Sequence, residues 1–263
     1  MQNSKILIHS RERVQDKFCF FLSFVIKVVK RYLMTEKEDR KMRDKYLKNS
    51  IEVTPELHPE KYKYMKAIAA ILEVSMPKVY IVDTKNKSRA CFSGTGEGFV
   101  VLSKYYVEHA PDYVLKSVFA HECGHKKFEH LIKRRAYMLI AGVEAFVVAE
   151  VLVMLLGLRD DLIASLIVVL VSSFVCFEWA FYKIRSQELT ADRCSAYVVG
   201  KKNRIDSLKV TYGWVEESRA SCKGWRERMK CFTWDVKFAI FKTHPSLNCR
   251  IRQVQEADFS GFQ

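Results

Sequence analysis

The sequence predicts an α+β fold, mostly helical, in which a domain with a small β-sheet is interrupted by a two-helix transmembrane hairpin. Two long apolar stretches, residues 136–158 and 162–182, are separated by only three residues. Short β-type runs with glycines between them precede this pair, and amphipathic helical patterns lie on both sides of it. A chain of 263 residues is long enough for one substantial domain.

Composition limits the classes of partner. The chain has 44 basic and 30 acidic residues, which gives a formal net charge of +14. Such a balance favours acidic surfaces, but no zinc finger, RNA-binding signature or basic aromatic patch occurs in the sequence. We therefore expect a lipid bilayer and not nucleic acid as the partner. The eight cysteines form no CxxC pair, which is typical of reduced thiols in a cytoplasmic setting.

Residues 1–49 are predicted to form a basic, amphipathic, membrane-associated segment. Its apolar run, Phe18 to Val29, is short and contains Lys27. A helix lying on an anionic membrane surface suits this pattern, and a tilted span is the alternative. Residues 36–48 carry mixed charges and predict a solvated helix or a linker.

The next part of the chain predicts a helix and a small sheet. Residues 62–74 have a helical pattern, and three β-type runs follow at residues 78–83, 90–93 and 99–102. Three alternate glycines, at 94, 96 and 98, stand between the last two runs. No Gly-Lys-Ser/Thr follows them, so a hairpin turn is favoured over a phosphate-binding loop.

A helix is expected to begin at Pro111-Asp112, because proline suits the first helical position and an acid suits the first turn. The apolar spacing that follows predicts a face packed on a core: Val114, Leu115, Val118 and Phe119. This face carries the segment His121-Glu122-Cys123-Gly124-His125 into the interior. The alternative is a charged surface helix whose histidines contact nothing.

An HExxH segment on a helix has the spacing of a zinc site. Residues four apart point the same way, so His121 and His125 can both reach one Zn²⁺ ion at roughly 2.0–2.1 Å. Glu122 would then stand beside the open coordination position. There it can take a proton from a water molecule that attacks a peptide carbonyl.

A catalytic zinc needs a third protein ligand. The metzincin pattern fails, because Phe128 and Leu131 stand where it requires glycine and histidine. His130 is expected to turn away from the ligand face as a solvated residue. Glu188 on a later helix is the candidate ligand, and Asp192, one turn further on, would accept a hydrogen bond from a ligand histidine. A solvated acidic face is the alternative for these two acids.

The two apolar stretches are each long enough to cross the roughly 30 Å hydrocarbon layer at 1.5 Å per residue. We therefore predict a transmembrane hairpin over residues 136–182. Basic residues flank it on both sides, whereas the loop between the stretches has one arginine and two aspartates: Lys126, Lys127, Lys133, Arg134, Arg135, Lys183 and Arg185. The positive-inside rule places the zinc site on the cytoplasmic side of the cell membrane.

Three glutamates lie within these stretches and leave a second interpretation open, a helical hairpin buried inside a soluble domain. Glu178 stands near a helix end and is expected to snorkel or to pair with Arg134 or Arg135. Glu144 and Glu150 are deeper, and we expect them to face a protein interior or to be protonated.

Four elements in this order resemble the HtpX-like membrane zinc metallopeptidases, relatives of the CAAX prenyl proteases. These elements are HExxH, a membrane hairpin, an ExxxD segment and a His-Pro element followed by arginine, here Thr243-His244-Pro245 and Arg250. The resemblance implies a zincin-like metallopeptidase domain split between residues 50–135, with HExxH, and residues 183–263, with the third ligand.

The resemblance also implies a role for each of these residues. Glu122 is the base, one Zn²⁺ ion is held by His121, His125 and Glu188, and Asp192 supports a ligand. His244 is the candidate oxyanion donor. Arg250 either serves the transition state or anchors acids in the site, with an ordinary surface cation as the alternative.

The chain departs from the family's pattern in several places. Ser246 stands where a second proline is usual. The strand that pairs with substrate in the family usually starts with Asn-Ala, and here Arg89 precedes Ala90, Cys91 and Phe92. Backbone pairing with an extended peptide would survive this change, because an edge strand offers its own N–H and C=O groups.

The sequence therefore predicts an integral-membrane zinc endopeptidase that cuts membrane or misfolded proteins, with protein quality control as its role. Three alternatives stay open: a CAAX-type prenyl-protein protease, a non-catalytic metal-binding membrane adaptor, and a soluble metallopeptidase with a docking hairpin. The intact Glu122 disfavours the adaptor, and two clear spans disfavour the many-helix cage of the prenyl proteases.

Overall fold

The computed structural model describes residues 44, 47–84, 90–93, 98–220 and 244–259. The described chain divides into two compact units. One consists of residues 135–180, and the other contains the described residues of 39–134 and 181–259. The predicted segment at residues 18–29 lies outside the described residues.

The larger unit contains a four-stranded sheet in the order β1-β2-β4-β3. Its strands are β1 (Ser50–Glu52), β2 (Lys78–Val82), β3 (Ala90–Ser93) and β4 (Phe99–Ser103). β1 runs antiparallel to β2, β2 parallel to β4, and β3 antiparallel to β4. The three predicted strands are confirmed to within one residue, and the antiparallel β3–β4 pair confirms the hairpin.

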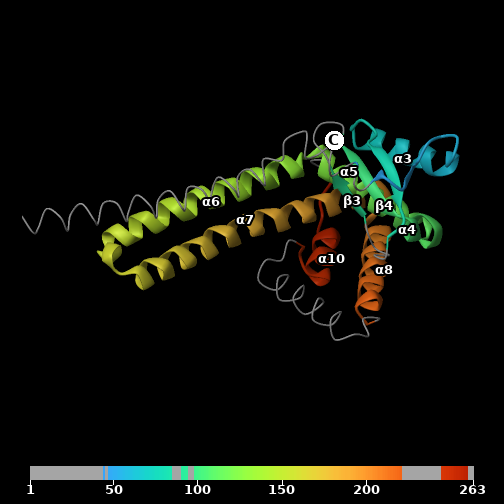
Figure 1. Cartoon of the computed structure of the whole chain (residues 1–263). Helices are drawn as coiled ribbons and strands as arrows, with labels where there is room; N and C mark the ends of the chain where they lie inside the picture. The colour runs from blue at the N-terminus through green and yellow to red at the C-terminus, as the bar shows by residue number, and fades with distance from the viewer. Residues whose placement is uncertain (1–43, 45–46, 85–89, 94–97, 221–243, 260–263) are drawn as a thin grey trace, which may run out of the picture. The chain divides into compact units, whose positions relative to one another are not determined.

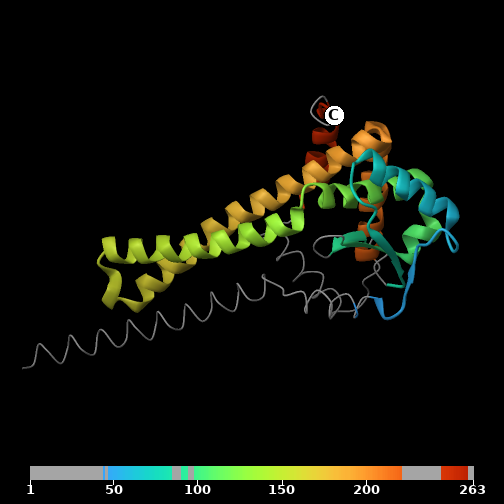
Figure 2. The ribbon, with the colours of Figure 1, turned by 90° about the horizontal axis from the view of Figure 1, so that it is seen from above.

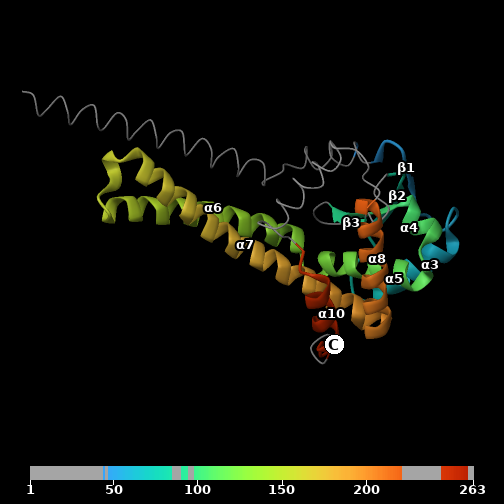
Figure 3. The same cartoon turned by 90° about the horizontal axis from the view of Figure 1, so that it is seen from below.

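Helices cover one face of this sheet (Figure 3). α3 (Pro59–Ile71) begins with proline, whose fixed φ suits a first helical position, and α5 (Asp112–Lys127) contacts α3 and β3. α4 (Lys104–His109) follows β4 directly and begins at Ser103, whose Oγ accepts a hydrogen bond from the N–H of Tyr106. The core between helices and sheet consists of large apolar side chains, among them Met65, Leu72, Val100, Leu102, Leu115 and Phe119.

Two further helices complete this unit, α8 (Lys201–Ala220), which packs against α5, and α10 (Leu247–Gln255), which packs against α8. Trp214 of α8 is partly buried against the core and makes edge contacts with Tyr105 and Tyr106. It therefore lies at the surface of the core.

The smaller unit is the helical hairpin. α6 (His130–Leu155) and α7 (Leu162–Val199) lie side by side in antiparallel directions (Figures 1 and 2). The short 3-10 helix Leu158–Asp160 joins them after Gly157, whose φ of 66° is in the left-handed region that favours glycine. α6 begins before the first predicted apolar stretch and ends three residues before its end, whereas α7 continues well beyond the second stretch. α7 therefore carries Glu188 and Asp192 as well as its apolar residues.

Both hairpin helices are long and apolar enough to cross a membrane. Only 22% of the most apolar window of α6 and 6% of that of α7 is buried. A hairpin inside a soluble domain would bury these side chains, so the soluble alternative is disfavoured. Large apolar residues cover the exposed surface, for example Val147, Val151, Leu166, Leu170 and Phe174.

Glu144 and Glu150 are both exposed on α6. Within the described residues, neither acid therefore faces the protein interior, which was the first of the two expectations for them, and protonation stays a prediction. The buried positions of α6 around these two acids are instead alanines spaced four residues apart, Ala141, Ala145 and Ala149. Small residues at this spacing let a neighbouring helix approach closely, and this packing leaves the larger side chains, acids included, on the outside.

Candidate active site

The HExxH segment occupies the last two turns of α5. Pro111 caps the helix, and the apolar face that follows is buried in the core, as expected. His121, Glu122 and His125 are all buried, with at most 8% of each residue exposed. The charged-surface-helix alternative is therefore wrong for this segment.

Gly124, inside the segment, lets α7 approach α5 closely. A Cβ atom placed on Gly124 would lie 3.0 Å from Cβ of Cys194 and 3.1 Å from Cα of Ala191. Both atoms belong to α7, and separations this short are tighter than nearly all real Cβ contacts. The missing side chain therefore brings α7, with Glu188, next to the two histidines.

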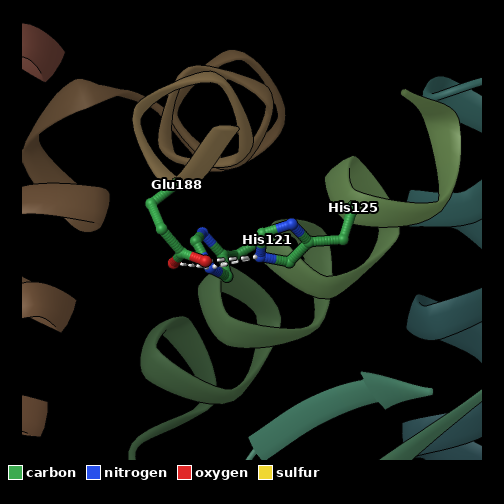
Figure 4. Close-up of side chains that lie close together, drawn as sticks. All are labelled: His121, His125 and Glu188. Atoms are coloured by element: carbon green, nitrogen blue, oxygen red, sulfur yellow. Dashed lines mark hydrogen bonds and ion pairs between the residues drawn. The ribbon is translucent and has the colours of Figure 1, made fainter. Parts of the chain in front are cut away.

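Three side chains converge at this crossing (Figure 4). Nε2 of His121 lies 3.1 Å from Nε2 of His125, and the two Glu188 oxygens lie 3.5 Å from one or the other of these nitrogens. Ligands about 2.0–2.1 Å from a tetrahedral Zn²⁺ ion are separated from one another by about 3.3 Å. These two imidazoles and one carboxylate therefore fit a single zinc ion in both chemistry and spacing.

The other ring nitrogen of His121 faces Asp192. Nδ1 of His121 lies 2.9 Å from Oδ1 of Asp192, and Asp192 is completely buried. Two arginines contact this carboxylate, Arg204 from α8 and Arg250 from α10. Asp192 is thus placed to orient His121 and is itself held by two cations.

The two arginines determine the charge state of Asp192. Burial alone would raise the pKa of Asp192, but Arg204 and Arg250 outweigh it and hold that pKa well below its usual range. Burial likewise would lower the pKa of His121, but its contacts with Asp192 and Glu188 outweigh burial and raise it. Asp192 therefore stays ionised and accepts the hydrogen bond.

His125 has a different partner, His130. The two Nδ1 atoms are 2.8 Å apart, and His130 is only 4% exposed. The prediction that His130 is solvated is therefore wrong. Burial, and next the nearby cation Arg134, lower the pKa of His130 to about 3, so it is neutral near pH 7. Burial also holds the pKa of His125 well below its usual range.

Glu188 is completely buried and lies among cationic and imidazole groups. His244 Nδ1 lies 2.9 Å from Oε2 of Glu188, and Arg134 contacts Oε1. Arg134 also donates a hydrogen bond of 3.1 Å from Nε to Gln187. Burial alone would raise the pKa of Glu188, but His125 and His244 outweigh it and hold that pKa well below its usual range.

Two predicted site residues near the C-terminal end of the described chain, His244 and Arg250, lie in different surroundings. The side chain of His244 is 51% exposed and lines the pocket, and Tyr212 Oη donates a hydrogen bond of 3.0 Å to the carbonyl of the following Pro245. Arg250 is 8% exposed and contacts Asp192. The surface-cation alternative for Arg250 is therefore wrong, and its position matches the role of anchoring an acid.

A pocket of about 170 Å³ opens over these groups. Glu122 lines it together with His121, His125 and Glu188, and Ala90 and Cys91 of β3 line it as well. β3 is the last strand in the order of the sheet, so one of its edges is directed away from β4. Phe92 belongs to the same strand, but its side chain lies outside what the structure describes.

Sequence reasoning missed Arg204, His130 and the role of Arg134. Arg204 follows Lys201 and Lys202 and so has the local pattern of a solvated helix start. The helical spacing of Arg204 is nevertheless informative. Arg204, Ser207 and Leu208 share one face of α8, and all three are buried.

The chain was compared with known proteins. The sequence profile of Peptidase family M48 matches residues 56–258. The crystal structure of Ste24p from S. mikatae is similar, with a TM-score of 0.50 and 14% sequence identity. That match covers 89% of this chain and 56% of the Ste24p chain, so this chain spans little more than half of that protein. No curated protein matches the chain.

Proposed function

Because the chain belongs to Peptidase family M48, we propose that it is a zinc-dependent endopeptidase of a membrane, with Glu122 as its catalytic base. The observation that carries this proposal is the meeting of His121, His125 and Glu188 at ligand spacing beside Glu122 in one pocket. His121, His125 and Glu188 would hold the ion. When bound, zinc polarises the peptide carbonyl and lowers the pKa of water to about 7.

Glu122 would supply the proton transfers. It follows His121 in the chain and faces the same pocket, so its carboxylate can take a proton from the attacking water and pass it to the leaving amine. General acid–base catalysis of this kind typically contributes about 10²–10⁴-fold to a rate. A metal-binding adaptor would have no use for this carboxylate.

His244 would stabilise the oxyanion that forms during hydrolysis. It lines the pocket, is half-exposed, and holds its Nδ1 2.9 Å from Glu188, so its other ring nitrogen is available to a substrate oxygen. Arg250 acts differently in this proposal. It contacts Asp192 and not the pocket, and it therefore positions His121 through that carboxylate.

The substrate would bind as an extended peptide along β3. Ala90 and Cys91 line the pocket on a terminal strand of the sheet, where backbone N–H and C=O groups can pair with a peptide. Phe92 continues this strand. Main-chain pairing favours unfolded polypeptide over any one sequence, which supports a role in protein quality control and not in trimming one prenylated terminus.

The hairpin formed by α6 and α7 would anchor the chain in the cell membrane, with the pocket on the cytoplasmic side. This orientation is supported by the positive-inside rule, because the basic residues flank the hairpin ends and the connecting loop is acidic overall. Resistance to carbonate extraction tests the anchoring. Reaction of an impermeant thiol reagent with Cys249 only after the cytoplasmic face has been opened tests the orientation.

The decisive experiment compares the purified chain with Glu122→Gln in detergent. Glu108→Gln is the matched control, because Glu108 is exposed on α4 and pairs only with Lys104 among the described residues. We expect all three proteins to bind one zinc ion. Only Glu122→Gln should lose cleavage of denatured casein, by about 10²–10⁴-fold.

Three outcomes contradict the proposal in distinguishable ways. Equal cleavage by wild type and Glu122→Gln would show that Glu122 is not the base. Zinc binding without any cleavage by wild type would favour the adaptor. Cleavage of a prenylated C-terminal peptide, with denatured casein left intact, would favour the prenyl-protein protease.

A further inference from the structure

His130 is brought back to His125 by a break between two helices. α5 ends at Lys127, and Glu129 adopts a φ of 52°, in the left-handed region that a non-glycine residue rarely enters. His130 then begins α6. In one continuous helix a residue five positions after His125 would point to another side, whereas this turn directs the ring of His130 at that of His125.

The contact between these rings is buried and close. Their Nδ1 atoms are 2.8 Å apart, and their ring centroids lie 5.0 Å apart at an angle of 70°. Phe128 stacks on the ring of His130, with ring centroids 5.8 Å apart and an interplanar angle of 19°. The ring of His130 is therefore fixed by packing as well as by the hydrogen bond.

The direction of this hydrogen bond follows from the other side of His125. Its Nε2 faces His121 and Glu188, so Nε2 is the atom available to a metal ion. A neutral imidazole that binds metal through Nε2 carries its proton on Nδ1. Nδ1 of His125 must then donate, and Nδ1 of His130 must accept.

We propose that His130 is a positioning residue that holds His125 in the ring orientation and tautomer needed to bind zinc. This inference rests on the proposed function, because it assumes the zinc site. His130 does for His125 what Asp192 does for His121. It is not itself one of the grouped ligands, since its Nδ1 is occupied by His125 and the described cluster consists of His121, His125 and Glu188.

Two substitutions separate the hydrogen bond from packing. His130→Leu keeps an apolar side chain of similar volume but removes the acceptor. His130→Asn restores an acceptor, because the Asn oxygen stands on the same carbon as Nδ1 of histidine. His109→Leu is the control, because His109 is exposed on α4, away from the pocket.

The measurement is zinc affinity of the full-length chain in detergent, by competition with a chromophoric chelator. We expect His130→Leu to weaken zinc binding by about 10–100-fold, as for other groups that support a metal ligand. His130→Asn should recover most of this loss, and His109→Leu should bind like wild type. A purely structural role would not be rescued by asparagine, because asparagine does not replace the packing of a ring against Phe128.

Wild-type affinity in His130→Leu would overturn the inference, and so would an asparagine variant as weak as the leucine variant while both remain folded by circular dichroism. If His130→Leu does not fold, the asparagine variant decides alone: zinc affinity close to that of wild type supports the inference, and a loss of about 10–100-fold overturns it. Failure of wild type to bind zinc would remove the proposed function together with this inference. Tight zinc binding by His130→Leu with an inactive Glu122→Gln would remove only this inference.

Discussion

Arg250 donates two hydrogen bonds to Asp192, from Nε to Oδ2 over 2.7 Å and from Nη2 to Oδ1 over 2.6 Å. Arg204 of α8 contacts the same carboxylate, and so does Nδ1 of His121. One buried carboxylate of α7 thus contacts side chains from three other helices, α5, α8 and α10, and one of these side chains is a candidate zinc ligand. Its removal would leave two guanidinium groups buried without their counter-ion.

Asp192→Ala should therefore lower the free energy of unfolding by about 3–5 kcal/mol, as expected when one partner of a buried ionic cluster is removed. Thermal unfolding of the purified chain measures this loss. Asp83→Ala serves as the control, because Asp83 is exposed just after β2. Equal unfolding temperatures for the two variants would contradict the structural role of Asp192.

Metal content should distinguish the two acids of α7. Glu188→Ala removes one of three candidate ligands and should empty the site, whereas Asp192→Ala removes no candidate ligand but takes away the hydrogen bond to His121, and it should weaken binding by about 10–100-fold. Atomic absorption after dialysis against a series of zinc concentrations measures both. Equal zinc content in wild type and the two variants would rule out this assignment.

Gly124→Ala should disturb the crossing of α5 and α7. The added Cβ would lie 3.0 Å from Cβ of Cys194, and overpacking of this kind typically costs about 1–3 kcal/mol. We also expect weaker zinc binding, because Glu188 moves with α7. Gly213→Ala is the matched control, since its new Cβ meets nothing within 4 Å and alanine favours a helix by about 0.5–1 kcal/mol. Opposite signs of the two stability changes are the expected result.

Tyr212→Phe should loosen the segment that carries His244. It removes the hydroxyl that donates to the carbonyl of Pro245, a contribution of about 0.5–1.5 kcal/mol. We expect reduced peptidase activity with unchanged zinc content. Tyr64→Phe is the control, because the buried hydroxyl of Tyr64 has no hydrogen-bond partner among the described residues. If Tyr212→Phe and Tyr64→Phe cleave substrate equally well, the hydrogen bond from Tyr212 to the carbonyl of Pro245 has no part in catalysis.

Acid should destabilise the metal-free protein in part through His130. Its pKa is about 3 in the folded chain and 6.5 by reference, so the unfolded chain binds the proton first as the pH falls. This contribution is complete above about pH 6.5 and is lost as the pH falls toward about 3. The unfolding temperature of wild type, in chelator, should therefore fall more than that of His130→Asn between about pH 7 and about pH 4. Parallel pH profiles would show that His130 is not held neutral.

The regular parts of this structure could be predicted from local pattern. Three strands, the hairpin and the helix that carries HExxH follow from periodicity and apolar length, and the long-range pair His125 and Glu188 follows from the need for a third ligand. The strand Ser50–Glu52 was missed because three residues next to a charged run carry too short a pattern.

Other features depend on tertiary structure. No glycine marks the turn at Glu129, so the sequence predicts a continuous helix and a solvated His130. Burial of Arg204 depends on Asp192, twelve residues earlier and on another helix, and no local pattern of charges encodes such a partner. The outward position of Glu144 and Glu150 depends on which side of α6 packs against other residues. The buried side is the one that carries the small alanines.

The close crossing at Gly124 has a consequence for the motif itself. A neighbouring helix, and not metal chemistry, favours glycine at its fourth position, because a Cβ atom there would lie 3.0 Å from Cβ of Cys194 and 3.1 Å from Cα of Ala191 on α7. A glycine at the fourth position of HExxH therefore indicates how closely the helix that carries the third, acidic ligand can approach the motif. We expect a larger residue there to accompany a wider helix separation, with a third ligand of longer reach.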